Sequence, residues 1–160
     1  NRYHAHATGT NAANAIKAEG FDGCWIFAMG TNDTANVAVG STIGVDERID
    51  RLMSVAGDNP AIWINVRSLV PSGPYSEADM QKWDDALLSA CEKYPNMRVY
   101  DWASRVKDEW FIDDGIHFTS EGYVARAKGI AKSVTEAFPP TAGLGGVWTP
   151  RTAPESCVVK

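Results

Sequence analysis

The chain lacks long hydrophobic segments, clusters of basic residues and paired cysteines. Its apolar runs fall well short of the roughly 20 residues that a membrane-spanning helix needs. Lysine and arginine total 15 against 20 aspartates and glutamates, and the net charge of -5 argues against a nucleic-acid-binding surface. Three cysteines without a C-x-x-C pair exclude the common zinc-finger and thiol-redox motifs. The glycine-rich segment 143–146 precedes neither a helix pattern nor a Lys-Ser/Thr pair, so a nucleotide-binding loop is not supported.

What remains is the composition of an ordinary globular domain, with 160 residues, 44% hydrophobic and 22% charged. We expect one domain over 1–140 and an irregular tail over 141–160, where the composition turns to Gly, Pro and Thr. The chain opens with Asn-Arg-Tyr-His and has neither an initiating Met nor a signal peptide. This start predicts a processed, trimmed or excised piece of a longer polypeptide.

The three cysteines have different surroundings. Cys24 lies in an apolar run and is expected to be a small buried residue. Cys91 falls in a helical pattern and Cys157 in the tail. A disulfide between Cys91 and Cys157 would fit an exported protein, but the sequence leaves open whether that bond forms.

Helical and strand-like patterns alternate along the chain. Apolar residues at spacings of three and four predict helices over 10–19, 45–56, 77–94 and 120–138. Short apolar runs predict strands over 24–29, 61–66 and 98–102. Unbroken apolar runs such as 24–29 are typical of strands that are covered on both faces of a parallel sheet. The sequence therefore predicts a three-layer α/β/α fold with a mainly parallel sheet.

Polar segments follow each of the three predicted strands. Asn32 comes after the first strand, the Pro/Ser/Gly loop 68–76 after the second, and the loop 114–117 after the third. Because functional groups of such folds gather at the carboxyl ends of the strands, we expect these segments along one edge of the sheet.

These segments contain groups suited to acyl transfer. Asp114 precedes His117 by three residues on a loop, where a carboxylate can turn back to orient the imidazole of a general base. The neighbouring Asp113 is an alternative orienting carboxylate. The amide of Asn32 and the backbone at Gly30 supply hydrogen-bond donors for an oxyanion. A nucleophile is the part that these segments lack.

Other residues suggest weaker assignments. Trp110 lies just before the Asp/His loop and is a candidate substrate-binding residue, and Arg67 at a strand end would contact an anionic or sugar substrate or form a surface salt bridge. His4 and His6 form an H-x-H pair without a third ligand nearby, so we expect no metal site. The loop serines do not stand on a sharp strand-to-helix turn; they are Ser41, Ser68, Ser72 and Ser76.

The segments Gly30-Thr31-Asn32-Asp33 and Asp114-Gly115-Ile116-His117 resemble the third and fifth conserved blocks of the SGNH (GDSL-type) hydrolases, a family of serine esterases, lipases and acyltransferase-associated domains. The resemblance covers roughly 1–138 and implies a flavodoxin-like SGNH hydrolase fold that uses no metal or organic cofactor. It assigns an oxyanion donor to Asn32 and two members of a catalytic triad to Asp114 and His117. Gly9 resembles, loosely, the second-block glycine whose backbone N–H is a further oxyanion donor.

The chain departs from this family at its first block. It contains no Gly-Asp-Ser segment, so the nucleophile and the N-terminal strand or strands are missing. Either that segment belongs to a preceding or companion piece, or the domain has lost its nucleophile and only binds. We favour the first explanation, because a sheet deprived of a central strand exposes apolar faces and an open edge.

We therefore expect a serine esterase, acyl hydrolase or O-acyltransferase-associated domain, extracytoplasmic or secreted, that acts on an O-acyl ester of a sugar or lipid. Its partners would be that ester and a companion N-terminal segment carrying Gly-Asp-Ser, with no nucleic acid and no membrane span. One alternative is a non-catalytic SGNH-like module that binds a carbohydrate or a protein. Another is an unrelated flavodoxin-like binding domain, in which Asn32 and His117 would lie too far apart to face one substrate.

Overall fold

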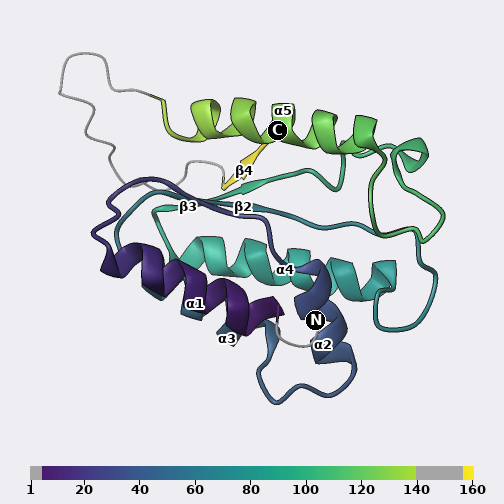
Figure 1. The fold of residues 1–160 in the computed structure, drawn as a ribbon, viewed down its shortest axis with the longest axis horizontal. Helices are drawn as coiled ribbons and strands as arrows, with labels where there is room; N and C mark the ends of the chain where they lie inside the picture. Colours follow the sequence, from purple (N-terminus) through teal and green to yellow (C-terminus); the bar gives the residue numbers. More distant parts are fainter. Residues whose placement is uncertain (1–4, 140–156) are drawn as a thin grey trace.

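The computed structural model describes residues 5–139 and 157–160, which form a parallel sheet between two layers of helices (Figure 1). The sheet has the strand order β1-β2-β3-β4, and all its neighbouring strands run parallel. The strands are Trp25–Phe27 (β1), Ala61–Ile64 (β2), Met97–Tyr100 (β3) and Val158–Val159 (β4). The predicted three-layer α/β fold is therefore confirmed.

The helices divide unequally between the two faces of the sheet. Helix α5 covers one face, where it packs on β2, β3 and β4, while α1, α3 and α4 form the layer on the other (Figure 1). The helices are Ala5–Ala18 (α1), Thr31–Ala38 (α2), Val45–Ala56 (α3), Glu77–Lys93 (α4) and Ser120–Ala137 (α5), with a 3-10 turn η2 at Asp108–Trp110. Among the described residues, none of these helices combines the length and the hydropathy of a bilayer-spanning segment.

Strand β2 contributes side chains to both hydrophobic cores, one on each face of the sheet. Trp63 points into the layer of α3 and α4, where it meets Trp83, whereas Ile62 and Ile64 point to the α5 layer and Tyr100. This division follows from the alternation of side chains along a strand. Each fully buried aliphatic side chain contributes about 1.5–3 kcal/mol, so an apolar strand in the centre of the sheet anchors both layers.

Strand β1 is exposed on one face, contrary to the prediction that the 24–29 strand is covered on both. Trp25 and Phe27 are buried, but Ile26 between them is 49% exposed. The reason is that β1 forms an edge of the sheet, and α5 lies over the other three strands. Among the described residues, no strand pairs with the other side of β1.

Helix α2 was not predicted, because Thr, Asn and Asp have low helix propensity. Tertiary contacts hold this segment in place. Asp33 accepts an ion-pair hydrogen bond of 2.8 Å from Arg48 of α3, and both side chains are buried. The same guanidinium donates to Ser41 at 2.8 Å and to the carbonyl of Ile43 at 3.0 Å. Asn32 therefore lies in the first turn of a helix rather than at a strand end.

The C-terminal residues correct the expectation of a tail without regular structure. Val158–Val159 pair with β3 as strand β4, and the amide of Val99 donates to the carbonyl of Cys157 at 3.0 Å. Cys157 forms a disulfide with Cys91 of α4, with the two Cα atoms 6.1 Å apart. The bond that the sequence left open is thus formed, while the part of the predicted tail over 140–156 lies outside the described residues.

We predict that replacing Cys91 by Ser lowers the free energy of unfolding by about 4 kcal/mol, because the bond closes a loop with a sequence separation of 66 residues. Urea unfolding measures the loss, and the double replacement of Cys91 and Cys157 should match the single one. Hydrogen exchange should also accelerate at the amide of Val99, while that of Ala61, which donates to Asn96, stays protected. Unchanged stability under a reducing agent would contradict this role of the bond.

Candidate active site

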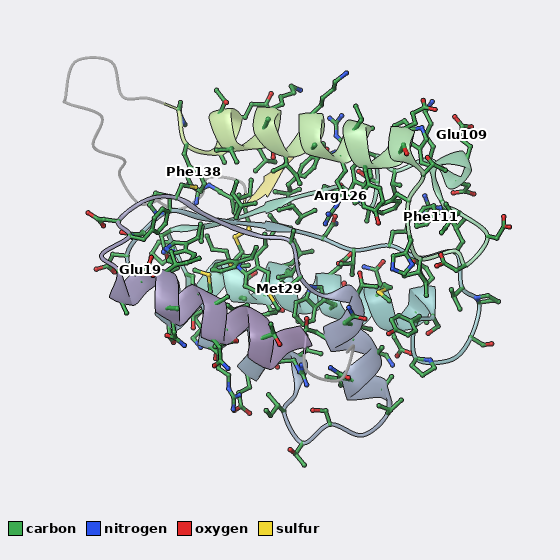
Figure 2. The ribbon with its side chains drawn as sticks, in the orientation of Figure 1. Glu19, Met29, Glu109, Phe111, Arg126 and Phe138 are labelled. Atoms are coloured by element: carbon green, nitrogen blue, oxygen red, sulfur yellow. A yellow bond between two sulfur atoms is a disulfide. The ribbon has the colours of Figure 1, made fainter. Side chains whose placement is uncertain are left out.

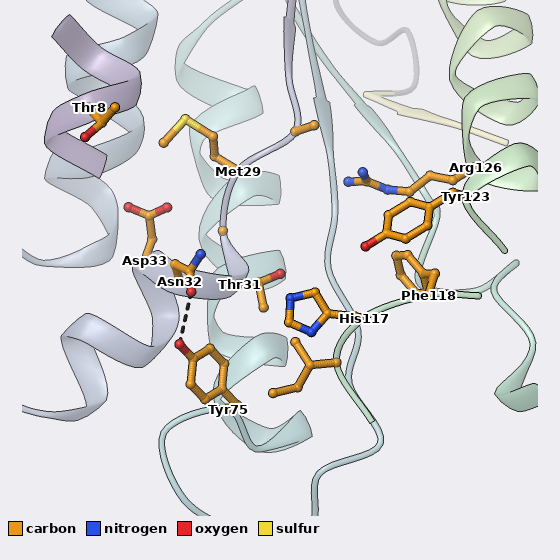
Figure 3. A pocket seen from close by; sticks show the side chains of 13 residues that line it. Thr8, Met29, Thr31, Asn32, Asp33, Tyr75, His117, Phe118, Tyr123 and Arg126 are labelled. Atoms are coloured by element: carbon orange, nitrogen blue, oxygen red, sulfur yellow. Dashed lines mark hydrogen bonds between the residues drawn. The ribbon is translucent and has the colours of Figure 1, made fainter. Parts of the chain in front are cut away.

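An open cavity of about 820 Å³ lies at the carboxyl end of β1 (Figure 3). Gly30 and Asn32 line it from the junction of β1 and α2, Tyr75 from the loop after β2, His117 from the loop before α5, and Arg126 from α5 itself. The three segments that the sequence places along one edge of the sheet therefore meet at one cavity. This arrangement argues against the alternative in which Asn32 and His117 lie too far apart to face one substrate.

Asp114, rather than Asp113, contacts the imidazole of His117. The Oδ2 atom of Asp114 lies 2.6 Å from Nδ1 of His117. Its Oδ1 atom accepts the backbone N–H groups of His117 at 2.9 Å and Ile116 at 2.8 Å. These bonds, led by the backbone bond from His117, lower the pKa of Asp114 to about 2. The carboxylate is therefore ionised at neutral pH and fixes the orientation of the ring.

The loop that holds this pair closes on itself. The amide of Ile112 donates to the carbonyl of His117 at 2.9 Å, and the amide of Gly115 donates to the carbonyl of Ile112 at the same distance. Gly115 has a φ of 67°, in the left-handed region that favours glycine. Its carbonyl accepts the amide of Leu69 at 2.8 Å, which ties the Asp/His loop to the loop after β2. The position of His117 is thus set by backbone bonds on both sides.

Gly30 makes the sharp turn from β1 into α2. Its φ is 137°, and an added Cβ would lie 2.5 Å from Nε1 of the buried Trp83. Only glycine fits both the backbone angle and the close packing. The turn places Asn32 in the first turn of α2, where the partial positive charge of the helix N-terminus adds to the donors that an oxyanion needs.

Tyr75 orients the amide of Asn32 and was not singled out from the sequence. Its hydroxyl donates to Oδ1 of Asn32 at 3.0 Å, which leaves the Nδ2 hydrogens as the free donors of the amide (Figure 3). The loop around Tyr75 is fixed because Ser68 donates to the Tyr75 carbonyl at 2.7 Å. The sequence places Tyr75 in the loop 68–76, which we expected at this edge of the sheet. No sequence spacing links Tyr75 to Asn32.

Asp114 does not line the cavity itself but contacts His117, which does, and three further predicted site residues lie apart from this group. Gly9 lies within α1 and packs against Met29, whose Cε would be 2.6 Å from an added Cβ. Trp110 stacks on Trp102 in the core beneath α5, with ring centroids 5.9 Å apart. Arg67 donates to Asp108 at 2.7 Å, which is the salt-bridge alternative considered for it. The structure therefore groups Gly30, Asn32, Asp114 and His117, and separates the other three from them.

No Ser or Cys is among the described residues that line the cavity. Three of the four loop serines make contacts that hold the fold instead. Ser41 accepts from Arg48, Ser68 donates to the carbonyl of Tyr75, and Ser76 caps the N-terminus of α4. The hydroxyl groups at the cavity, among the described residues, are those of Thr8, Thr31, Tyr75 and Tyr123.

His4 and the side chain of His6, which form the H-x-H pair, lie outside the part of the chain that the structure describes. Within the described ranges, no three His, Cys, Asp or Glu side chains gather as potential metal ligands.

Solved esterases share this fold. The sequence matches no family model and no curated protein. One similar structure is an acetyl esterase with acetate ion, in a mutant in which a serine is replaced by alanine. It has a TM-score of 0.57 and 16% identity, over 85% of this chain and 67% of that one. A carbohydrate esterase family 3 protein from Talaromyces cellulolyticus gives a TM-score of 0.57 and 17% identity over the same shares. At such identities the likeness establishes the fold.

We predict that Gly30→Ala destabilises the protein more than Gly40→Ala does. Both glycines have positive φ, but only the Cβ at position 30 meets a neighbour, since nothing lies within 4 Å of the one at position 40. The matched control should cost about 1–2 kcal/mol from backbone strain alone, and Gly30→Ala clearly more. Urea unfolding followed by tryptophan fluorescence measures both losses. Equal losses would show that packing against Trp83 does not restrict this turn.

Proposed function

We propose that this chain is the larger part of a serine esterase or O-acyltransferase domain of the SGNH type, which acts on a short O-acyl ester of a sugar or lipid. The observation that carries the proposal is the cavity where the imidazole of His117, bonded to Asp114, and the oriented amide of Asn32 come together. The two solved structures with this fold support it, because one is an acetyl esterase and the other a carbohydrate esterase. They favour a sugar ester over a lipid.

The geometry supplies most parts of an acyl-transfer reaction. With Nδ1 held by Asp114, the Nε2 atom of His117 is the one that removes the proton from an attacking serine hydroxyl. The ionised Asp114 stabilises the imidazolium that forms, and the Nδ2 donors of Asn32 stabilise the oxyanion. His117 then returns the proton to the leaving alcohol, and water or an acceptor hydroxyl releases the acyl group from serine. None of these steps involves a metal or an organic cofactor.

We further propose that the nucleophilic serine comes from a segment that pairs with the open edge of β1. A parallel strand added there would end at the same edge of the sheet as Gly30 and Asn32, next to the cavity. The residues that connect this strand to the rest of the fold would also cover the exposed side chain of Ile26, which α5 does not cover. The lengths of the neighbours agree, since the matched region spans 67% of each of them. The disulfide between Cys91 and Cys157 supports an extracytoplasmic location for the assembled protein.

A second candidate function is a binding module without catalysis. It is favoured by the lack of Ser and Cys among the described residues that line the cavity. Such a module would use the same cavity for a carbohydrate or a protein segment and would need no further strand.

We predict that a fluorophosphonate serine probe labels the native preparation on a companion peptide containing Gly-Asp-Ser. Denaturing mass spectrometry locates the adduct. The His117→Ala variant should fold, as judged by circular dichroism, but should react far more slowly because its serine is no longer activated. A single folded species of 17.4 kDa without an adduct would instead favour the binding module.

In the complete enzyme, we predict that Asn32→Ala lowers kcat about 10²-fold or more, as expected for one lost oxyanion donor. Tyr75→Phe should cause a smaller loss, because the amide keeps its donors but is no longer oriented. Tyr94→Phe is the matched control, since it removes a hydroxyl that bonds Asp50 at 2.7 Å, outside the cavity. Steady-state hydrolysis of an acetyl ester measures all three. Wild-type kcat in Asn32→Ala would remove this residue from the mechanism.

A further inference from the structure

Arg126 brings a positive charge to the cavity without a partner for it. The residue lies on the side of α5 that faces the sheet (Figure 2), and its guanidinium extends into the cavity beside Tyr123 (Figure 3). Its Nε atom is buried and has no hydrogen-bond partner. Burial lowers the pKa of the Arg126 guanidinium, while its nearest titratable neighbours, Tyr123 and Tyr100, raise it. Among the described residues, no carboxylate lies within ion-pair distance of it.

The other arginines with buried or half-buried side chains are satisfied. Arg48 pairs with Asp33 at 2.8 Å, and Arg67 pairs with Asp108 at 2.7 Å. Arg98 donates to the backbone carbonyls of Pro95, in the turn after α4, and Met97, at the start of β3. Among the arginines that the structure describes, Arg126 therefore stands out, because its buried Nε atom has no acceptor, which costs free energy in the unliganded protein.

The surroundings of Arg126 do not offer an internal anion. The one carboxylate among the residues that line the cavity is Asp33, and its Oδ1 atom is bonded to Arg48. A guanidinium binds planar anions through two parallel hydrogen bonds, so a carboxylate is the ligand that suits it best.

We propose that Arg126 binds a carboxylate on the ester substrate, so that the site prefers acidic esters to neutral ones. The inference rests on the proposed function, because it concerns the substrate of the same cavity. A volume of about 820 Å³ is within the range of small-molecule sites and accommodates both an acyl group and a sugar ring. The reacting ester lies between Asn32 and His117, and the carboxylate lies toward α5. Tyr123, one helical turn before Arg126 and 48% exposed, offers its ring to the apolar face of a sugar.

Two sources of the carboxylate are distinguishable. It belongs either to an acidic sugar that bears the acyl group or to the acyl chain itself, as in the half-ester of a dicarboxylic acid. Methyl β-D-glucuronide represents the first source and monomethyl succinate the second, with methyl β-D-glucoside and methyl butyrate as the neutral counterparts. None of these probes needs turnover, so binding can be measured on this chain by calorimetry or NMR titration.

We predict that at least one acidic probe binds this chain roughly tenfold or more tightly than its neutral counterpart, as expected for a charge-assisted pair. Arg126→Gln should abolish that preference. Arg126→Lys keeps the charge but cannot form the two parallel hydrogen bonds of a guanidinium, so it should retain part of the preference. Lys128→Gln is the matched control, because it removes the same charge from an exposed position of the same helix and should keep the wild-type preference.

Thermal unfolding separates this role from a structural one. Since Arg126 has no partner in the described part of the chain, Arg126→Gln should not lower the Tm in the absence of ligand. The proposal is overturned if neither acidic probe binds, if acidic and neutral probes bind equally, if the preference survives in Arg126→Gln, or if that variant is clearly destabilised. These outcomes leave the esterase proposal standing, because labelling of serine by the fluorophosphonate probe does not depend on an acidic substrate.

Discussion

The buried ion pair between Asp33 and Arg48 is the interaction on which the candidate site depends most. It joins α2 to α3 across a segment whose own residues are poor helix formers. Removing one partner of such a pair costs about 3–5 kcal/mol, because the other charge stays buried. Without α2, neither the turn at Gly30 nor the direction of the Asn32 amide would be defined. A contact that lies outside the reaction thus sets the side of the cavity that holds Asn32.

The two halves of the site are built in different ways. Asp114 and His117 are joined within one short loop, by bonds that span two or three residues. The oxyanion half instead requires β1, α2, α3 and the loop of Tyr75 to meet, which involves contacts far apart in the sequence. The contact between Asp114 and His117 therefore needs only the loop, whereas the position of the Asn32 amide needs the folded domain.

This difference explains what the sequence could predict. Periodicity located the central strands and the long helices, and the spacing of Asp114 and His117 identified the local half of the site. Helix α2 was missed because a tertiary ion pair overrides its weak propensity, and β4 because two residues are too short for a pattern. Tyr75 and Arg126 carry no motif, since their importance arises from what the fold places beside them. The sequence thus predicts groups that lie close together in the chain, but it does not predict contacts between residues far apart in the chain.

The order of strands in the sheet is the same as their order in the chain. During synthesis the sheet can therefore grow in one direction, with each new strand added to the edge left by the previous one. Strand β4 closes the far side and is then locked to α4 by its neighbouring cysteine. No described strand pairs with the other side of β1, so this order of addition leaves that side as it was when β1 formed. The strand that we propose for that side would therefore join the sheet outside this order.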